Sequence, residues 1–79
     1  MRKAPTKEAR DRAKKIGARI RWLRQQADMT LLEVAEEIGL QLQTISKYEA
    51  GDIAVSMERA EQLARVFKVK PIDIIGWTA

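Results

Sequence analysis

The fold of this chain is decided by residues 30–51, which run TLLEVAEEIGLQLQTISKYEAG. Thr30 followed by Glu33 forms a capping box, in which each side chain satisfies a backbone N–H group near the other, so a helix is predicted to begin here. Gly39 permits the positive φ of a tight exit from that helix, and residues 41–48 are predicted to form the next one. The stretch therefore predicts two short helices joined by a turn.

On the N-terminal side, apolar residues recur at steps of four and three, which predicts one long helix with a single apolar stripe. The stripe consists of Ala9, Ala13, Ile16, Ile20, Leu23 and Ala27. Pro5 and Thr6 are suitable start signals. Gly17 interrupts the pattern at a cost of about 1 kcal/mol relative to alanine, so either the helix is packed closely there or it begins near Lys15. The sequence leaves both open.

On the C-terminal side, Ser56 is predicted to cap a fourth helix and Pro71 to stand in the first turn of a fifth. Their expected apolar positions are Met57, Ala60, Leu63, Ala64 and Phe67 in the fourth helix and Ile72, Ile74 and Ile75 in the fifth. No segment alternates with the period of a strand. The prediction is an all-α fold, a compact five-helix bundle.

Composition narrows the function. The chain has 79 residues, no cysteine and no histidine, so one small domain is expected, without disulfides or the usual zinc ligands. No paired carboxylates, phosphate loop or nucleophile–base arrangement is visible, so we expect neither an enzyme nor a cofactor or metal. No apolar stretch approaches the roughly 18 residues of a membrane span or follows the basic N-terminus as in a secretory signal, so a cytoplasmic protein is expected.

The charge of the chain is uneven. Residues 1–24 contain ten basic and two acidic residues, a net charge of +8, whereas residues 25–79 contain five basic and nine acidic residues, a net charge of −4. A basic block of this density favours attraction to a polyanion, although a solvated lysine-rich helix would also explain it.

Residues 30–51 resemble the helix-turn-helix of the Cro/CI-type (XRE-like) DNA-binding family. The resemblance rests on the small Ala35 where two helices approach, Gly39 in the turn, the buried anchor Ile45, and Glu49 near the end of the next helix. It extends over roughly residues 15–76.

This resemblance implies a lambda-repressor-like domain whose third helix enters the major groove while the second crosses the phosphate backbone. The expected division is a basic N-terminal arm or extension of the first helix at 1–14, the helix-turn-helix domain at 15–76, and a tail at 77–79.

The resemblance places the base contacts on the exposed side of the third helix, where plain solvated residues are the alternative. Glutamine can pair with adenine and lysine with guanine, so Gln43 and Lys47 are the leading candidates. The expected base-contacting residues are Gln41, Leu42, Gln43, Ser46 and Lys47. Many relatives have glutamine where this chain has Leu31 and Leu42. One interpretation is that Leu42 contacts a thymine methyl group. A second is that both leucines are ordinary part-buried residues. A third is that they join Leu32 in an apolar patch for a protein partner.

Phosphate contacts are expected mainly from the first helix and the segment before it, because residues 40–56 contain one cation, Lys47. The expected phosphate-contacting residues are Arg2, Lys3, Lys7, Lys15, Arg19, Thr30, Leu31 and Thr44. The alternative for the N-terminal arm is a frayed terminus that only raises solubility.

The resemblance also implies a structural ion pair between Arg24 and Glu49. The expected function is a homodimeric, sequence-specific double-stranded DNA-binding transcription regulator, a repressor, that binds a palindromic operator. Its dimer contact is assigned to Ile72, Ile74, Ile75 and Trp77, which could equally close the core of the monomer. The alternative function is a protein-binding helical adaptor or antitoxin, favoured by the leucines and by the acidic second helix.

Overall fold

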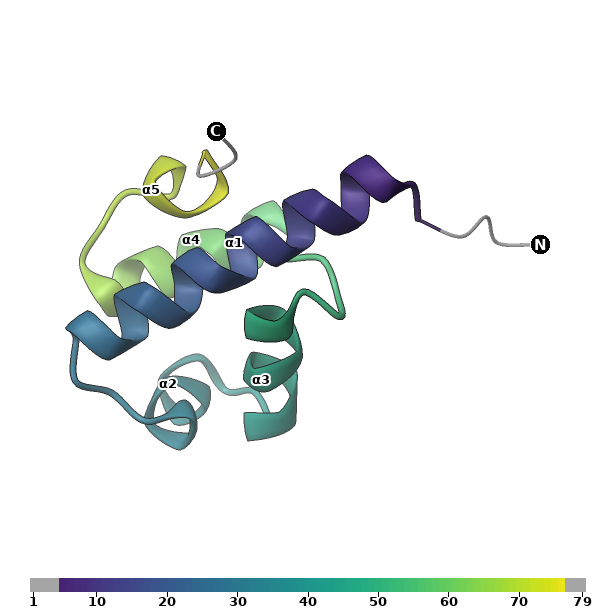
Figure 1. The fold of residues 1–79 in the computed structure, drawn as a ribbon. Helices are drawn as coiled ribbons and strands as arrows, with labels where there is room; N and C mark the ends of the chain where they lie inside the picture. The colour runs from purple at the N-terminus through teal and green to yellow at the C-terminus, as the bar shows by residue number, and fades with distance from the viewer. Residues whose placement is uncertain (1–4, 77–79) are drawn as a thin grey trace.

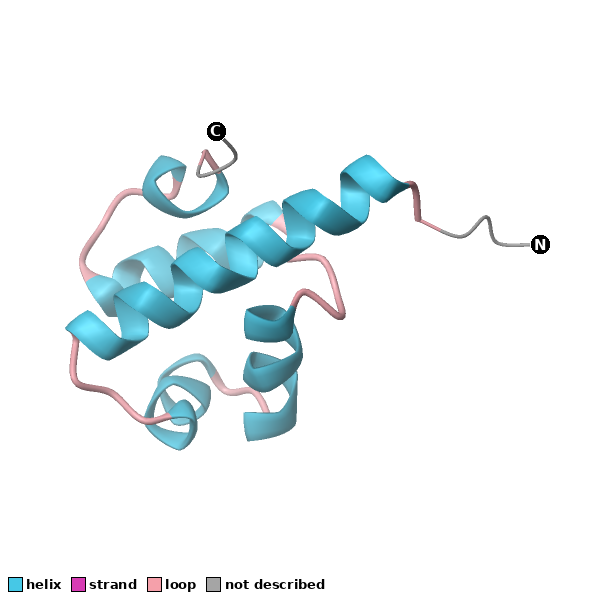
Figure 2. Cartoon of the chain, viewed as in Figure 1, coloured by secondary structure: helices cyan, strands magenta, loops and turns pink. Residues whose placement is uncertain are grey.

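The computed structural model describes residues 5–76, and this part of the chain forms five α-helices without a strand. The helices are α1 (Lys7–Gln26), α2 (Leu31–Ile38), α3 (Leu42–Ala50), α4 (Met57–Phe67) and α5 (Ile72–Ile75). In Figure 1, α1 lies across the molecule with α4 behind it, α2 and α3 below it and α5 above it, and Figure 2 shows the loops that join them. The predicted five-helix, all-α fold is confirmed. No helix in this part of the chain has both the length and the apolar character needed to cross a membrane.

The helix start signals act as the sequence predicts. Thr6 accepts a hydrogen bond from the backbone N–H of Ala9 at 3.1 Å, and Ser56 accepts one from Arg59 at 3.1 Å. In the capping box of α2, Thr30 Oγ1 accepts from the backbone N–H of Glu33 at 3.1 Å while Glu33 Oε1 accepts from the backbone N–H of Thr30 at 2.9 Å. These bonds use N–H groups that a helix leaves without intrahelical partners.

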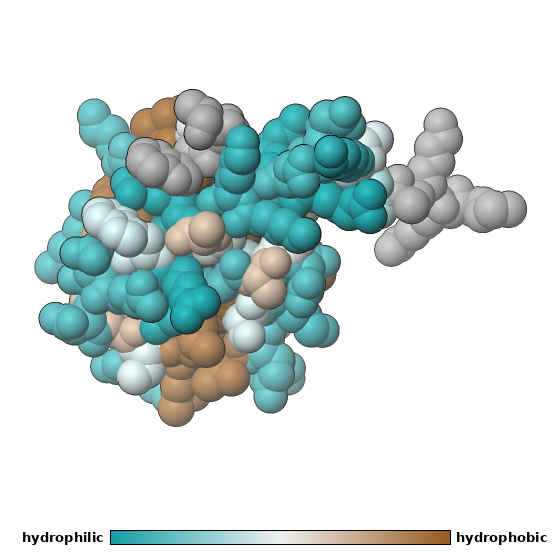
Figure 3. All heavy atoms as spheres, in the orientation of Figure 1, coloured by the Kyte–Doolittle hydropathy of each residue, from teal (hydrophilic) through white to brown (hydrophobic). Residues whose placement is uncertain are grey.

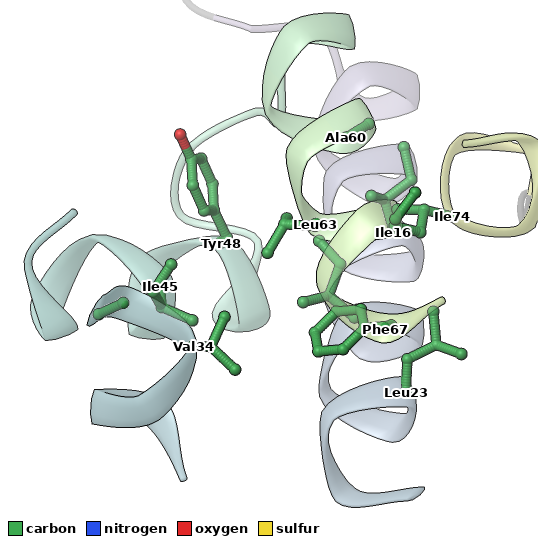
Figure 4. Close-up of a cluster of buried hydrophobic side chains, with 12 residues drawn as sticks. Ile16, Leu23, Val34, Ile45, Tyr48, Ala60, Leu63, Phe67 and Ile74 are labelled. Atoms are coloured by element: carbon green, nitrogen blue, oxygen red, sulfur yellow. The ribbon is translucent and has the colours of Figure 1, made fainter. Parts of the chain in front are cut away.

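The core gathers between α1 and the other four helices (Figure 4). It is made by the buried apolar residues Ile16, Ile20, Leu23, Val34, Ala35, Ile45, Tyr48, Ala60, Leu63, Ala64, Phe67 and Ile74. Most of them stand at the predicted apolar positions. Met57 does not join the core. It is the first residue of α4, and its side chain is 57% exposed.

Gly17 lies inside α1, which runs unbroken from Lys7. A Cβ atom at Gly17 would stand 2.2 Å from the backbone oxygen of Tyr48 and 2.6 Å from that of Glu49. Of the two explanations that the sequence leaves open, close packing is therefore the observed one. Residues 7–14 continue the first helix, while residues 1–4 lie outside the described part of the chain.

Candidate nucleic-acid interface

The turn between α2 and α3 depends on Gly39. This residue adopts a left-handed conformation with φ 69° and ψ 33°, and no heavy atom beyond its own residue and its two chain neighbours lies within 4 Å of where its Cβ would be. Glycine is therefore favoured here by backbone conformation and not by space. The next residue, Leu40, donates its backbone N–H to the carbonyl oxygen of Ala35 at 2.9 Å, which closes the end of α2. The turn lets α3 start in a new direction two residues later.

Helix α3 presents a polar side to solvent and an apolar side to the core. Ile45 is fully buried and Tyr48 is 7% exposed, so both anchor the helix to the body. Gln41, just before the helix, and Leu42, Gln43, Ser46 and Lys47 within it are all exposed, and we call these five residues the recognition face. Thr44, expected to contact phosphate, is half-buried. All five expected base-contacting residues are therefore accessible to solvent.

An ion pair holds α3 against α1. Arg24 Nε donates to Glu49 Oε2 at 2.6 Å and Nη2 donates to Oε1 at 3.1 Å, while Nη1 donates to the backbone oxygen of Met29 at 2.9 Å. The side chains of Arg24 and Glu49 are only 14% and 8% exposed. The hydrogen bonds with Glu49 raise the pKa of Arg24, which keeps the guanidinium charged. This bidentate, part-buried pair fixes the orientation of the recognition face.

The N-terminus of α2 already has an internal anion. The backbone N–H of Thr30, and then its side chain, lower the pKa of the Glu33 carboxyl, so this group is negatively charged at neutral pH. The Thr30 backbone N–H is therefore occupied, although its hydroxyl can still donate. Leu31 is half-buried and packs against the core.

The cations of α1 point in different directions. Gly17 and Arg24 contact α3, which defines the α3 side of the helix. At 100° per residue, Lys15 and Arg19 both lie about 160° around α1 from Gly17. Arg19 Nε donates to the backbone oxygen of Asp73 in α5 at 2.9 Å. The guanidinium also lies 4.7 Å from the ring centroid of Trp22.

The structure therefore does not bring Lys15 and Arg19 to the side of the recognition face. Lys7 lies in the first turn of α1, and Arg2 and Lys3 lie outside the described residues. The expected list of phosphate contacts omitted Arg10, Lys14 and Arg21, which stand at helical spacing from Gly17 on the α3 side. That spacing was visible in the sequence, but the side that meets α3 was not.

The proposed dimer residues separate into buried and exposed ones. Ile74 is fully buried in the monomer core between α1, α4 and α5, so its assignment to the dimer contact is wrong. Ile72 is 62% exposed and Ile75 is half-buried. Trp77 lies outside the described residues. An isoleucine pair two residues apart on a short helix points to opposite sides, which is why Ile72 and Ile74 differ.

One exposed leucine lies in the recognition face and another lies in α2. Leu32 in α2 is 52% exposed and Leu42 in α3 is 37% exposed. Figure 3 shows apolar surface where the lower ends of these two helices come together. Among residues 5–76, no group of histidine, cysteine, aspartate or glutamate side chains is arranged to hold a metal ion.

Comparison with known proteins identifies the arrangement. The helix-turn-helix family profile matches residues 20–74, which is more than half of the chain. The antitoxin PezA of Streptococcus pneumoniae is 38% identical over 61 residues, covering 77% of this chain and 39% of PezA. The uncharacterized HTH-type transcriptional regulator y4wC of Sinorhizobium fredii is 36% identical over 56 residues, covering 71% of this chain and 39% of y4wC. The chain thus spans about two fifths of the length of these relatives, and no solved structure gives a significant match.

Proposed function

This chain belongs to the helix-turn-helix family, and from that premise we propose that it is a homodimeric transcriptional regulator that binds a specific double-stranded DNA sequence and represses transcription. The observation that carries the proposal is the recognition face of α3, an accessible polar surface on a helix anchored by Ile45, Tyr48 and the Arg24–Glu49 ion pair. Such a rigid helix fits the major groove of B-DNA. The protein acts in the cytoplasm, with residues 15–76 as the DNA-binding domain, residues 1–14 as its basic N-terminal part and residues 77–79 as its tail.

Base contacts come from the recognition face. Gln43 and Lys47 stand four residues apart and so lie on the same side of α3. Gln43 pairs with adenine through its amide, and Lys47 donates to O6 and N7 of guanine. Leu42 packs against a thymine methyl group, with Gln41 and Ser46 at the margins.

Phosphate contacts close to the recognition face come from the first turn of α2 and from α3. The Thr30 hydroxyl, the first-turn backbone N–H of Leu31 and the Thr44 hydroxyl donate to phosphate oxygens. Lys7 adds charge at the start of α1. Because Glu33 already accepts the hydrogen bond of the Thr30 backbone N–H, the phosphate contacts at the N-terminus of α2 use the Thr30 hydroxyl and the Leu31 backbone N–H.

Dimerisation uses Ile72 and Ile75 of α5, with Trp77 added from the C-terminal tail. Two copies related by a two-fold axis place two recognition faces about 34 Å apart, one turn of B-DNA. Trp22 of α1 is 48% exposed, and its ring lies against Arg19, which donates to the backbone oxygen of Asp73 in α5, so we assign Trp22 to the same interface. Aromatic residues of this kind often carry interface energy.

Selection of bound sites from a random pool of duplex DNA tests the proposal. We expect a palindromic consensus with half-sites one helical turn apart, lost when Gln43 and Lys47 are both replaced by alanine. Replacement of the exposed Gln25 and Gln26 at the end of α1 serves as the matched control and is expected to leave the consensus unchanged. Failure of the intact protein to enrich any sequence would refute sequence-specific binding. A consensus without symmetry would refute the dimer.

A second function is favoured by one relative and one surface. The antitoxin PezA matches over most of this chain. The apolar surface around Leu32 adjoins Glu33, Glu36 and Glu37 of α2, which could face a basic protein partner. Co-expression with the product of the neighbouring gene, followed by purification, tests this function. A stable complex that Leu32→Ser abolishes would support it, and independent migration of the two proteins would contradict it.

A further inference from the structure

The exposed charges of α1 are sorted by side. Relative to Gly17, which abuts the backbone of α3, Arg10 lies about 20°, Arg21 about 40° and Lys14 about 60° around the helix. All three side chains are exposed, and within residues 5–76 no carboxylate lies at ion-pairing distance from any of them. We call these three residues the basic stripe. Figure 3 shows hydrophilic side chains covering the N-terminal part of α1.

The opposite side of α1 is different, because it also carries both acidic residues of the helix. Glu8 and Asp11 lie about 180° and 120° from Gly17. They share one surface hollow with Arg12 and Lys15. The charges on that side therefore partly cancel, whereas those of the basic stripe add.

Contacts place the basic stripe alongside α3. Arg21 lines a shallow hollow together with Ser46 of the recognition face and Ala50. Further toward the N-terminus of α1, a Cβ atom on Gly51 would stand only 2.7 Å from Cα and Cγ of Lys14. The stripe thus begins beside the middle of α3, passes its C-terminal end and continues to Arg10, one turn beyond Lys14.

The loop after α3 lacks charges that could hold DNA. Its residues 52–55 are Asp-Ile-Ala-Val, whose one charged side chain is acidic. A helix in the major groove has phosphates on both flanks, and attraction to them requires cations nearby. Within the described residues, the cations beside the C-terminal end of α3 are those of the basic stripe, apart from Lys47 of α3 itself, which is assigned to base contact.

We propose that Arg10, Lys14 and Arg21 bind the DNA backbone that flanks the C-terminal half of α3, in place of cations in the loop that follows it. The proposal rests on the function proposed above and assigns its main electrostatic contacts to one side of α1. Lys15 and Arg19, on the far side, make no phosphate contact.

Two triple variants of the full chain with equal loss of charge test this assignment. The first replaces Arg10, Lys14 and Arg21 with glutamine, which keeps the Cγ atom of Lys14 that packs near Gly51. The control replaces Arg12, Arg65 and Lys70, which are exposed cations away from the stripe. Affinity is measured against salt on the selected operator and on a mixed-sequence duplex, where binding is almost purely electrostatic.

Each phosphate contact contributes about 0.9 to the slope of log affinity against log salt, so the stripe variant is expected to lose about 2.7. Between about 50 and 200 mM salt, the factor by which the affinity of the stripe variant falls would then be about 40 times smaller than the factor for the intact protein. The control is expected to keep the original slope. Equal slope changes in both variants, or none in the stripe variant, would overturn the proposal.

The outcome separates this assignment from the proposed function. A reduced slope on the mixed-sequence duplex without any selected operator would support the stripe and refute sequence-specific regulation. Absence of all duplex binding by the intact protein would refute both. Should the triple variant fail to fold, Arg10→Gln alone, at an exposed site one turn from the nearest α3 contact, is expected to lower the slope by about 0.9.

Discussion

Gly17→Ala is expected to destabilise the protein, although the same change in an exposed helix would stabilise it. The new Cβ would stand 2.2 Å from the backbone oxygen of Tyr48 and 2.6 Å from that of Glu49. Both distances are well below van der Waals contact, and the obstructing atoms belong to the backbone of α3. The clash can be relieved only if α3 moves away from α1 as a unit.

The magnitude follows from two opposing effects. Alanine is preferred over glycine inside a helix by about 1 kcal/mol. Forcing an extra methyl group into a packed contact costs about 1–3 kcal/mol, and the upper end applies because the Arg24–Glu49 ion pair anchors α3 beside the same contact. The expected result is a net loss of about 2 kcal/mol in the free energy of unfolding, or roughly 10 °C in Tm for a domain of this size.

Thermal and urea unfolding followed by circular dichroism measure this loss. Ala18→Gly is the control, since Ala18 is the exposed neighbour of Gly17 in α1 and its replacement reports helix propensity alone. It is expected to cost about 1 kcal/mol. A rise in Tm for Gly17→Ala would refute the close α1–α3 packing. Tighter DNA binding by that variant would contradict the role of this contact in placing the recognition face.

Three further changes separate the contributions of charge and packing. Arg24→Met should lower the free energy of unfolding in urea by about 3–5 kcal/mol, because it leaves Glu49 buried and unpaired. Adding Glu49→Leu should recover most of that loss. Additive losses from the two substitutions would contradict the coupling of the two side chains. Because hydrogen bonds lower the folded-state pKa of Glu33, its charged form stabilises the fold above the ordinary glutamate pKa of about 4.3, and this stabilisation is lost as the pH falls through the lowered value. Glu33→Gln should therefore flatten the acid part of a Tm-against-pH curve, and an unchanged curve would exclude the carboxylate as its source. Ile74→Ala should cost about 2–5 kcal/mol of stability, because Ile74 is fully buried. Ile72→Ser should leave the Tm of the monomer nearly unchanged and weaken dimerisation measured by sedimentation. Equal Tm losses in the two variants would contradict the assigned burial.

Local features of the fold could be predicted because their causes lie within one or two helical turns. The caps at Thr6, Thr30 and Ser56 each depend on a bond to a residue three positions along. Gly39 adopts the positive φ that its position at the end of α2 suggests. The exposure of Gln43 and Lys47 followed from the inward direction of the apolar residues on the same helix.

The sequence could not decide features that depend on a distant partner. Ile72 and Ile74 are equally apolar, and only packing against α1 and α4 decides that one is exposed and the other fully buried. Lys15 and Arg19 belong to the basic block, but they lie on the side of α1 away from α3. The number of these charges can be read from the sequence, but the side of α1 that faces α3 cannot.

The sequence by itself determined five helices, their caps, the helix-turn-helix and the concentration of positive charge before residue 25. Hydrogen bonds between near neighbours and the 3.6-residue period are encoded in short segments, so they could be inferred without coordinates. Tertiary structure alone decided that Gly17 meets the backbone of α3 and that the basic stripe shares this side. The direction of a helix side chain becomes a position on the molecule only after residues far apart in the chain have packed together.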